Sequence, residues 1–294
     1  MIKRRISTSD IVITASLLIL TISCLLPMLN TLAVSFSDKT SAGLGKVFIW
    51  PVGLTFAPYA QILQDKQFFI SFFNSVNRVL LGGVVNVVIT ILMAYPLSKS
   101  KKDFRAKNIF MWFVVFTMLF NGGLVPNYIL VQRLGLIDSI WALVLPGAVP
   151  VFSVIILMNY FKGLPASLEE AALIDGANPF DVLLKIFVPL SMPSIAVVAL
   201  FSVVGHWNAF FDGIIYITKE AKQPLQTYIQ QLQFGIDYQL INSTNVEQMM
   251  EHLKLSSLTF NSAKVIVSMI PILLIYPLLQ RFFVTGIIMG AVKE

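Results

Sequence analysis

Charged residues are scarce in this chain. Asp, Glu, Lys and Arg make up 12% of its 294 residues, and hydrophobic residues make up 56%. Soluble domains carry about 25% charged residues, and the mean hydropathy here is +0.80. This excludes an ordinary soluble protein and predicts one polytopic membrane domain. The net charge of +6 therefore indicates basic loops beside a membrane, not a nucleic-acid partner.

Cysteine and histidine are also nearly absent, which removes whole classes of site. The single cysteine, Cys24, allows neither a disulfide framework nor a cysteine metal site, and His252 has no ligand spacing to any Cys or His. The stretch 43–46 ends in Gly-Lys but lacks the Walker A spacing, and neither H-E-x-x-H nor G-x-S-x-G occurs. We therefore expect no metal, no cofactor and no enzymatic activity in this chain.

What the sequence has instead is long apolar runs, and a membrane-spanning helix needs about 20 such residues. Six runs meet or approach that length: 11–36, 72–97, 109–131, 140–161, 194–217 and 263–283. The second is the least clean, because Asn74, Asn77 and Arg78 lie near its start. The pattern predicts an all-α membrane protein with six transmembrane helices. The basic residues before the first run would suit a signal peptide, but the run is over-long and lacks a clear cleavage site, so we take it as an uncleaved span.

The distribution of Lys and Arg predicts the orientation. The N-terminus carries three positive charges and the short stretch 98–108 carries five. Placing both in the cytoplasm puts the segment 162–193 and the C-terminus there as well. We expect a multi-pass protein of the cytoplasmic membrane of a bacterium, with both termini inside and long outer segments at 37–71 and 218–262.

The segment 162–193 is a polar, helix-forming island between the fourth and fifth runs. Ser167 and Glu170 have the spacing of a capping box, which predicts a helix start at Ser167. Gly176 suits the left-handed residue that closes a helix, and Asn178 with Pro179 predicts the start of a second helix.

We expect Asp181 and Lys185 to pair on the exposed side of this second helix, and Pro189 and Pro193 to end it. Asp175 stands at the negative end of the first helix, where a carboxylate is unfavourable, so a partner contact explains it better. The alternative is an ordinary cytoplasmic hairpin.

Here the sequence resembles the EAA loop of ABC-importer permeases. The resemblance rests on Glu170-Ala171-Ala172, Asp175-Gly176-Ala177, Ile186 ten residues after the glycine, and Pro189-Leu190. Val188 stands where the family usually has Leu. The resemblance implies a type I ABC importer permease whose hairpin docks on a cytoplasmic ATPase. The residues implied in coupling are Glu169, Glu170, Ala171, Ala172, Asp175, Gly176 and Ala177.

The same resemblance implies an assembly of several chains. It comprises a second homologous permease subunit, two ATPase subunits that bind ATP and Mg²⁺, and an extracytoplasmic solute-binding protein met through the outer segments. Further stretches are similar to maltose-type importers of oligosaccharides: 121–128, 134–143, 207–212 and 286–293. The implied cargo is an oligosaccharide, with uronic plant oligosaccharides among the candidates. The alternatives are a non-sugar cargo, or a secondary transporter or channel that works without an ATPase.

Polar and aromatic residues inside apolar runs are the candidates for the substrate pathway. The C–H faces of sugars stack on aromatic rings, and their hydroxyl groups form hydrogen bonds with side-chain amides. On this basis we expect Trp207, Asn208, Phe211, Asp212, Asn121 and Tyr128 to line it, with Asn208 and Asp212 one helical turn apart. The alternative is that these side chains satisfy one another between helices.

Overall fold

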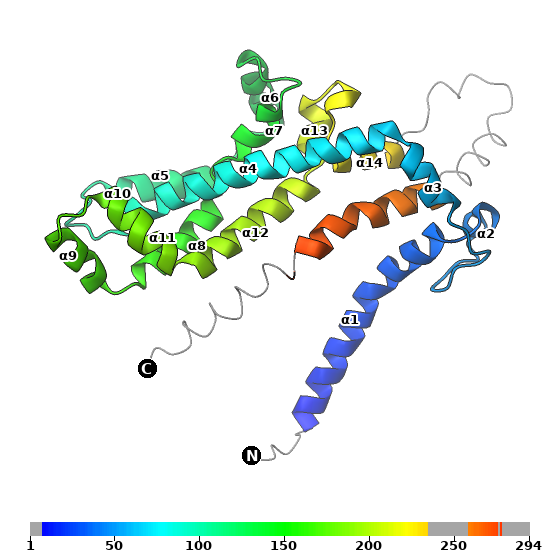
Figure 1. The fold of residues 1–294 in the computed structure, drawn as a ribbon, viewed down its shortest axis with the longest axis horizontal. Coiled ribbons are helices and arrows are strands. Elements are labelled where there is room, and N and C mark those ends of the chain that lie inside the picture. Colours follow the sequence, from blue (N-terminus) through cyan, green and yellow to red (C-terminus); the bar gives the residue numbers. More distant parts are fainter. Residues whose placement is uncertain (1–7, 235–257, 276, 278–294) are drawn as a thin grey trace. The chain divides into compact units, whose positions relative to one another are not determined.

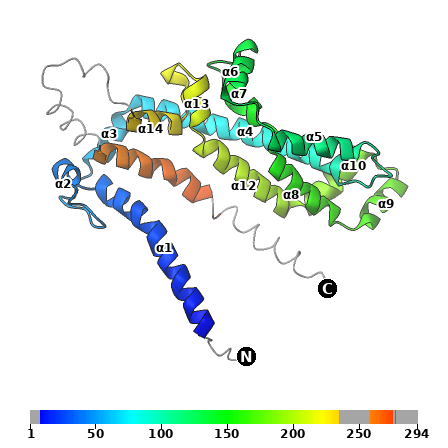
Figure 2. The same cartoon turned by 180° about the vertical axis from the view of Figure 1, so that it is seen from behind.

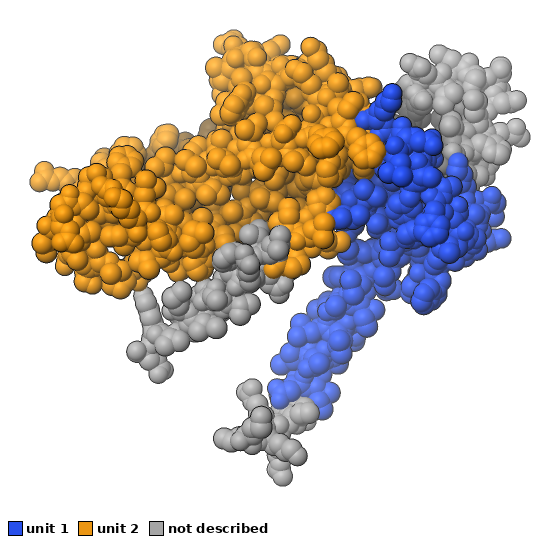
Figure 3. All heavy atoms as spheres, in the orientation of Figure 1, with its two compact units in different colours: residues 1–66, 229–270 blue, residues 67–228, 271–294 orange. Residues whose placement is uncertain are grey.

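The computed structural model describes residues 8–234, 258–275 and 277. Its regular elements are all helices across these residues, as Figures 1 and 2 show. The chain forms two compact units, residues 1–66 with 229–270 and residues 67–228 with 271–294 (Figure 3). The all-helical prediction is confirmed for the described part of the chain.

The first unit contains α1 (Thr8–Ser35), a helix whose apolar side chains are largely exposed. At about 1.5 Å per residue it is long enough to cross a bilayer, and lipid is the solvent that suits such a surface. The chain then folds back through α2 (Lys39–Gly43) and α3 (Ala57–Gln64). The amide of Asn30 on α1 donates to the carbonyls of Val47 (3.1 Å) and Phe48 (2.8 Å) and so holds the returning segment.

The first unit also includes most of the helix Leu258–Ile275, drawn in orange in Figure 1. Its Lys264 side chain is 2% exposed and pairs with Asp65 at 2.6 Å. The rest of the predicted run 263–283 lies outside the described residues, except 277.

The second unit is organised around α4 (Lys66–Ser98), which reverses the usual helix pattern. Along most of its length its buried face is a stripe of polar and small residues at helical spacing, and many of its large apolar side chains are exposed. That stripe runs through Ser71, Ser75, Arg78, Gly82, Asn86, Thr90 and Ala94. Small and polar residues are what membrane helices place between one another. The polar start of the second apolar run is therefore an internal contact surface: Asn74 donates to the carbonyl of Ala221 (2.9 Å), and Ser75 accepts from the backbone N–H of Leu225 (2.7 Å).

Three of the predicted runs are interrupted. The third run forms α5 (Lys107–Leu119) and α6 (Leu124–Arg133), which meet at 111°. The glycine pair between them allows this bend, since Gly123 has φ +91°. The fourth run forms α7 (Ile140–Val144), the 3₁₀ turn η1 (Leu145–Gly147) and α8 (Val151–Lys162), bent by 49°; prolines within and after η1 interrupt it.

The fifth run, expected as one helix over 194–217, is α12 (Met192–Asn208) followed by a separate α13 (Phe211–Tyr216). The 3₁₀ turn η3 (Glu220–Lys222) and α14 (Leu225–Phe234) follow. In the described residues, three helices are long and apolar enough to cross a membrane, or up to six if each bent pair is one span. The expectation of a continuous helix is wrong for the third, fourth and fifth runs, and the count of six spans stays a prediction.

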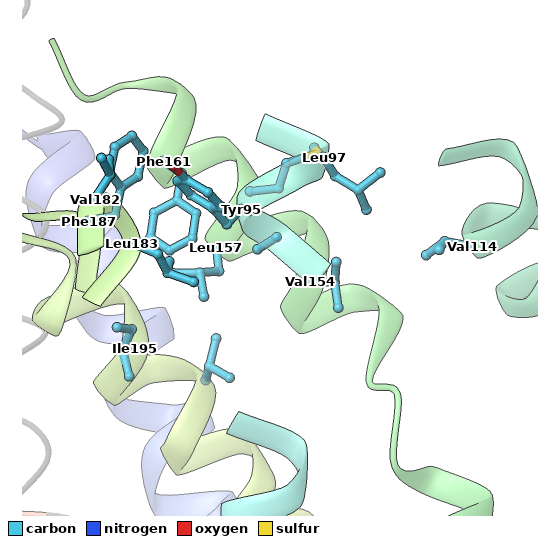
Figure 4. Close-up of a cluster of buried hydrophobic side chains, with 13 residues drawn as sticks. Tyr95, Leu97, Val114, Val154, Leu157, Phe161, Val182, Leu183, Phe187 and Ile195 are labelled. Atoms are coloured by element: carbon cyan, nitrogen blue, oxygen red, sulfur yellow. The ribbon is translucent and has the colours of Figure 1, made fainter. Parts of the chain in front are cut away.

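The main apolar core of the second unit lies where α4, α8 and α12 run side by side (Figures 1 and 2). Three aromatic rings join there: Phe187 packs edge-to-face on Tyr95 at 5.1 Å and on Phe161 at 5.4 Å between ring centroids. Figure 4 shows these rings gathered around Leu157, with Val182 and Leu183 beside them. This cluster packs the segment before α12 against the long helices.

A largely buried ion pair links α4 to the break between α12 and α13. The guanidinium of Arg78 on α4 is 2% exposed and forms a two-point ion pair with the carboxylate of Asp212, which is 28% exposed. Arg78 also donates to the carbonyl of Ala209 (3.1 Å), the C-terminal capping residue of α12. The cation thus sits at the negative end of α12 and beside an acidic residue in the first turn of α13. It holds both sides of the break between these helices.

Next to the ion pair, α12 approaches α4 closely. A Cβ atom added to Gly82 would lie 2.3 Å from Nε2 of His206, whereas one added to Gly83 would meet nothing within 4 Å. Gly82 is therefore needed for the His206 imidazole to lie this close to α4.

We predict that Asp212→Asn lowers stability by about 3–5 kcal/mol, because it leaves the buried charge of Arg78 without its partner. Arg78→Met leaves the 28%-exposed carboxylate of Asp212 unpaired and should cost less. The double variant should lose less than the sum of the two. The measurement is thermal unfolding in detergent. Asp181→Asn, which removes the partner of the 76%-exposed Lys185, is the control and should cost under about 1 kcal/mol. Additive single effects would contradict this account.

Candidate functional site

The hairpin begins with α9 (Ala166–Ile174), one residue before the predicted start. Its capping position is Pro165, and no side chain caps the helix. Proline fixes φ, and here it presents an extended residue before the first turn, so Ser167 already lies inside the helix. The predicted capping box of Ser167 and Glu170 is therefore wrong, and Glu170 is left exposed.

The turn of the hairpin agrees with the prediction. Gly176 has φ +82°, and two backbone bonds close α9, from Gly176 to the carbonyl of Leu173 (3.1 Å) and from Ala177 to that of Ala172 (2.9 Å). This is the Schellman arrangement, which needs a left-handed residue. Asn178 then caps α10 (Pro179–Val182) by accepting from the backbone N–H of Asp181 at 3.0 Å.

The second arm differs from the prediction at its far end. After α10 the chain continues as a π-helical turn, η2 (Leu183–Phe187), and α11 (Val188–Leu190). Pro189 lies inside this arm, because the wider π turn just before it accommodates a residue that cannot donate to the helical ladder. The arm ends at Leu190, and Pro193 belongs to the first turn of α12, at 83° to the arm. The predicted ending at Pro189 and Pro193 is therefore wrong.

The predicted pair on this arm does form, with Lys185 2.7 Å from Asp181. The hydrogen bond from Lys185 lowers the pKa of Asp181 below its usual value.

The seven residues predicted to couple divide into three groups. Glu170, Ala171, Asp175 and Gly176 are exposed. Ala172 and Ala177 are half-buried against the aromatic core. Glu169 forms an ion pair with Lys99, within this same chain. The outward-facing residues have apolar neighbours, since Ile174 is 86% and Phe180 67% exposed.

The predicted pathway residues 207–212 do not lie on one helix. Trp207 is buried and packs on Phe72 with ring centroids 5.7 Å apart. Asn208 is the last residue of α12 and is exposed, and Phe211, 57% exposed, starts α13. Asp212 follows it and pairs with Arg78. The expected one-turn spacing of Asn208 and Asp212 is therefore wrong, because the helix stops between them.

The other two predicted residues make contacts at the bend between α5 and α6 and between α6 and α13. Asn121 lies between α5 and α6, where its carboxamide oxygen accepts from the backbone N–H of Gly123 at 2.9 Å. Tyr128 on α6 stacks on Tyr216 of α13 with ring centroids 6.3 Å apart. The structure thus does not bring all six predicted residues together.

A cavity of about 270 Å³ lies beside the ion pair, with a largely apolar wall that carries a few polar side chains. Its walls come from α4, α7 to α8, α12 and α13, and both Arg78 and Asp212 line it. Four lining residues each have one buried polar atom without a hydrogen-bond partner: Nε of Arg78, Oδ1 of Asn86, Oγ of Ser202 and Nε2 of His206. Buried polar atoms of this kind need water or a ligand. Sequence reasoning missed Asn86 and Ser202; the charge of Arg78 inside an apolar run was the available signal.

Another missed residue is Asp138, between α6 and α7. Its carboxylate accepts from the hydroxyl and backbone N–H of Thr218, both at 2.7 Å, and from the backbone N–H of Lys219 at 3.0 Å. The Thr218 hydroxyl, and then the two backbone amides, lower the pKa of Asp138. Asp138 thus anchors the start of the long segment 218–262.

Comparison with known proteins agrees with this architecture. The chain is 36% identical over 288 residues to the polygalacturonan/rhamnogalacturonan transport system permease protein YtcP of Bacillus subtilis (strain 168), covering 97% of this chain and 98% of that protein. It is 37% identical over 272 residues to protein LplC of the same organism, covering 92% and 89%.

A solved structure is also similar. One chain in the crystal structure of a bacterial ABC transporter involved in import of the acidic polysaccharide alginate matches with a TM-score of 0.81 and 31% identity, over 96% of this chain and 100% of that one. The family described as "Binding-protein-dependent transport system inner membrane component" matches residues 68–289. The chain belongs to this family of transport permease subunits.

Proposed function

We propose that this chain is one of two homologous permease subunits of an ATP-driven bacterial importer of oligosaccharides. It spans the membrane six times with both termini in the cytoplasm, and the hairpin 162–193 faces the cytoplasm. Two separate ATPase subunits hydrolyse ATP, and an extracytoplasmic binding protein delivers the sugar. The observation that carries the proposal is the hairpin: its outer face is exposed and partly apolar, and its inner face is packed into the core.

The ion pair argues against a self-sufficient secondary transporter. Such a transporter needs an intramembrane carboxylate that binds and releases its coupling ion. Asp212 is the carboxylate that the sequence offers for this role, and Arg78 already holds it at two points. On this proposal, transport is driven by ATP hydrolysis in a separate subunit, and the exposed hairpin is the surface on which that ATPase docks.

The same pair bears on the cargo. One relative is a polygalacturonan/rhamnogalacturonan transport system permease, which supports an oligosaccharide cargo and includes acidic sugars among the candidates. Phosphate as cargo is less well supported, because Asp212 compensates the charge of Arg78 at the cavity. The remaining polar lining of amide, hydroxyl and imidazole suits sugar hydroxyls.

For the substrate pathway we assign different roles to the predicted residues. Asn208 directly precedes Ala209, and Phe211 directly precedes Asp212; Ala209 and Asp212 line the cavity, and Asn208 and Phe211 are exposed beside it. Trp207 and Asp212 stabilise the break, and Asn121 and Tyr128 support the bend of α5 and α6 and its contact with α13. The proposed contacts are an amide and an aromatic face at the rim of the cavity.

Purification from the native membrane tests the function as a whole. We expect a second permease and an ATPase to co-purify in a one-to-one-to-two ratio. In liposomes, the complex with its binding protein should take up oligogalacturonides only with ATP. Uptake by this chain alone, without ATP, would refute the proposal; ATP-driven uptake of amino acids but not of sugars would refute the cargo.

The turn of the hairpin gives a second test. Gly176→Pro should abolish uptake and binding-protein-stimulated ATP hydrolysis while leaving membrane insertion intact, because proline cannot adopt φ +82°. Gly176→Asn is the matched control: asparagine tolerates the left-handed region, and a Cβ there meets nothing within 4 Å. Normal uptake by the proline variant would show that the shape of the turn is not needed for coupling.

At the cavity rim, Asn208→Ala should raise the KM for sugar uptake about tenfold, the effect of losing about 1.4 kcal/mol of hydrogen bonding. Thermal stability should not change, because the side chain is exposed. Asn127→Ala on α6 removes an exposed amide from a helix that does not line the cavity and should leave KM unchanged. Equal KM values for both variants would remove Asn208 from the pathway.

A further inference from the structure

Lys99 directly follows the last residue of α4, and its side chain turns back toward the hairpin. Its ammonium group pairs with the carboxylate of Glu169 in the first half of α9. The two side chains are only 13% and 27% exposed. The nearby Lys101 and Lys102 are exposed, as expected for residues that only set orientation.

Two aromatic rings hold the same ammonium group. It lies 3.9 Å from the ring centroid of Tyr95 on α4 and 4.5 Å from that of Phe187 in the π turn of the second arm. These rings pack edge-to-face on each other, and both belong to the core shown in Figure 4. A cation over aromatic faces is attracted by their negative charge density, more strongly when it is partly removed from water. Lys99 thus contacts both arms of the hairpin at once.

A third contact ties in the next helix. The ammonium group of Lys107, the first residue of α5, donates to the backbone carbonyl of Lys99. The connection between α4 and α5 is therefore fixed at the residue that binds the hairpin.

We propose that Lys99 is a positioning residue for transport: it fixes the hairpin to the end of α4, so that the two move as one body. This rests on the proposed coupling role of the hairpin. Glu169 then acts inward, toward Lys99, and leaves Glu170 to face the ATPase. About 30 Å along the same continuous helix, at about 1.5 Å per residue, α4 carries Arg78 to the cavity. A displacement of the hairpin therefore reaches the cavity through α4.

The first experiment uses the full complex with its binding protein in liposomes and measures sugar imported per ATP hydrolysed. Lys99→Met should lower this ratio fivefold or more, a factor of about the size of ordinary coupling energies, while the subunits still assemble. Lys99→Arg keeps the charge and the ring contacts and should retain the ratio. Lys101→Met is the exposed control. An unchanged ratio in Lys99→Met, with wild type coupling normally, would overturn the inference; absence of ATP-driven uptake in wild type would instead overturn the proposed function.

A second experiment does not depend on how well Lys99→Met folds. In a Cys24→Ala background, Lys99→Cys and Glu169→Cys are joined by a short thiol-specific cross-linker that bridges the same gap. The untreated cysteine pair lacks the Lys99 contacts and should show the lowered sugar-to-ATP ratio of Lys99→Met. Because the cross-link again joins α9 to the end of α4, it should restore this ratio toward that of wild type. Loss of transport on cross-linking, restored by cleaving the linker, would show that the two must separate and would overturn the inference.

Discussion

A buried positive charge sets the arrangement of the second unit. Arg78 is almost inaccessible, and a guanidinium remains charged at any physiological pH, so the protein must supply what water or lipid cannot. It does so with the carbonyl of Ala209, the residue after α12, and the carboxylate of Asp212 in the first turn of α13. Both partners lie at the break between Asn208 and Phe211. The break, the ion pair and the cavity beside them are thus one feature.

A second largely buried cation, Lys99, lies directly after the C-terminal end of α4 and is stabilised by different groups. Lys99 is less buried than Arg78, and its partners are one carboxylate and two aromatic faces. Arg78 on α4 and Lys99 directly after it are thus two largely buried cations, each bound to a segment distant in sequence: the break after α12 and the hairpin 162–193. Between them runs the stripe of small and polar residues that keeps α4 against its neighbours. This explains why the second apolar run looked the least clean in the sequence.

The features that could be predicted from the sequence are those that depend on interactions between residues close together in the chain. Gly176, Asn178 and the Asp181–Lys185 pair behave as expected, because left-handed closure, capping and four-residue spacing involve only near neighbours. The predicted capping box failed at the same scale, since α9 begins at Ala166, directly after the extended Pro165, and Ser167 already lies inside it. The separation of Asn208 from Asp212 could not be read from apolar length alone. It depends on Arg78, more than a hundred residues away, and no local pattern shows that pairing. Asn86 and Ser202 were missed because small polar residues in an apolar run look like minor interruptions.

The charge balance at the cavity also limits what this chain can contribute to selectivity. With Arg78 committed to Asp212, the cavity offers hydrogen-bonding groups and aromatic edges but no free cation among its described lining residues. Such a surface accommodates sugar hydroxyls without strongly attracting a carboxylate, and a carrier must release its cargo as well as bind it. On the proposed function, discrimination for an acidic sugar would therefore fall to the binding protein or the second permease. This chain would supply a passage whose polar groups are fixed and whose position is set through α4.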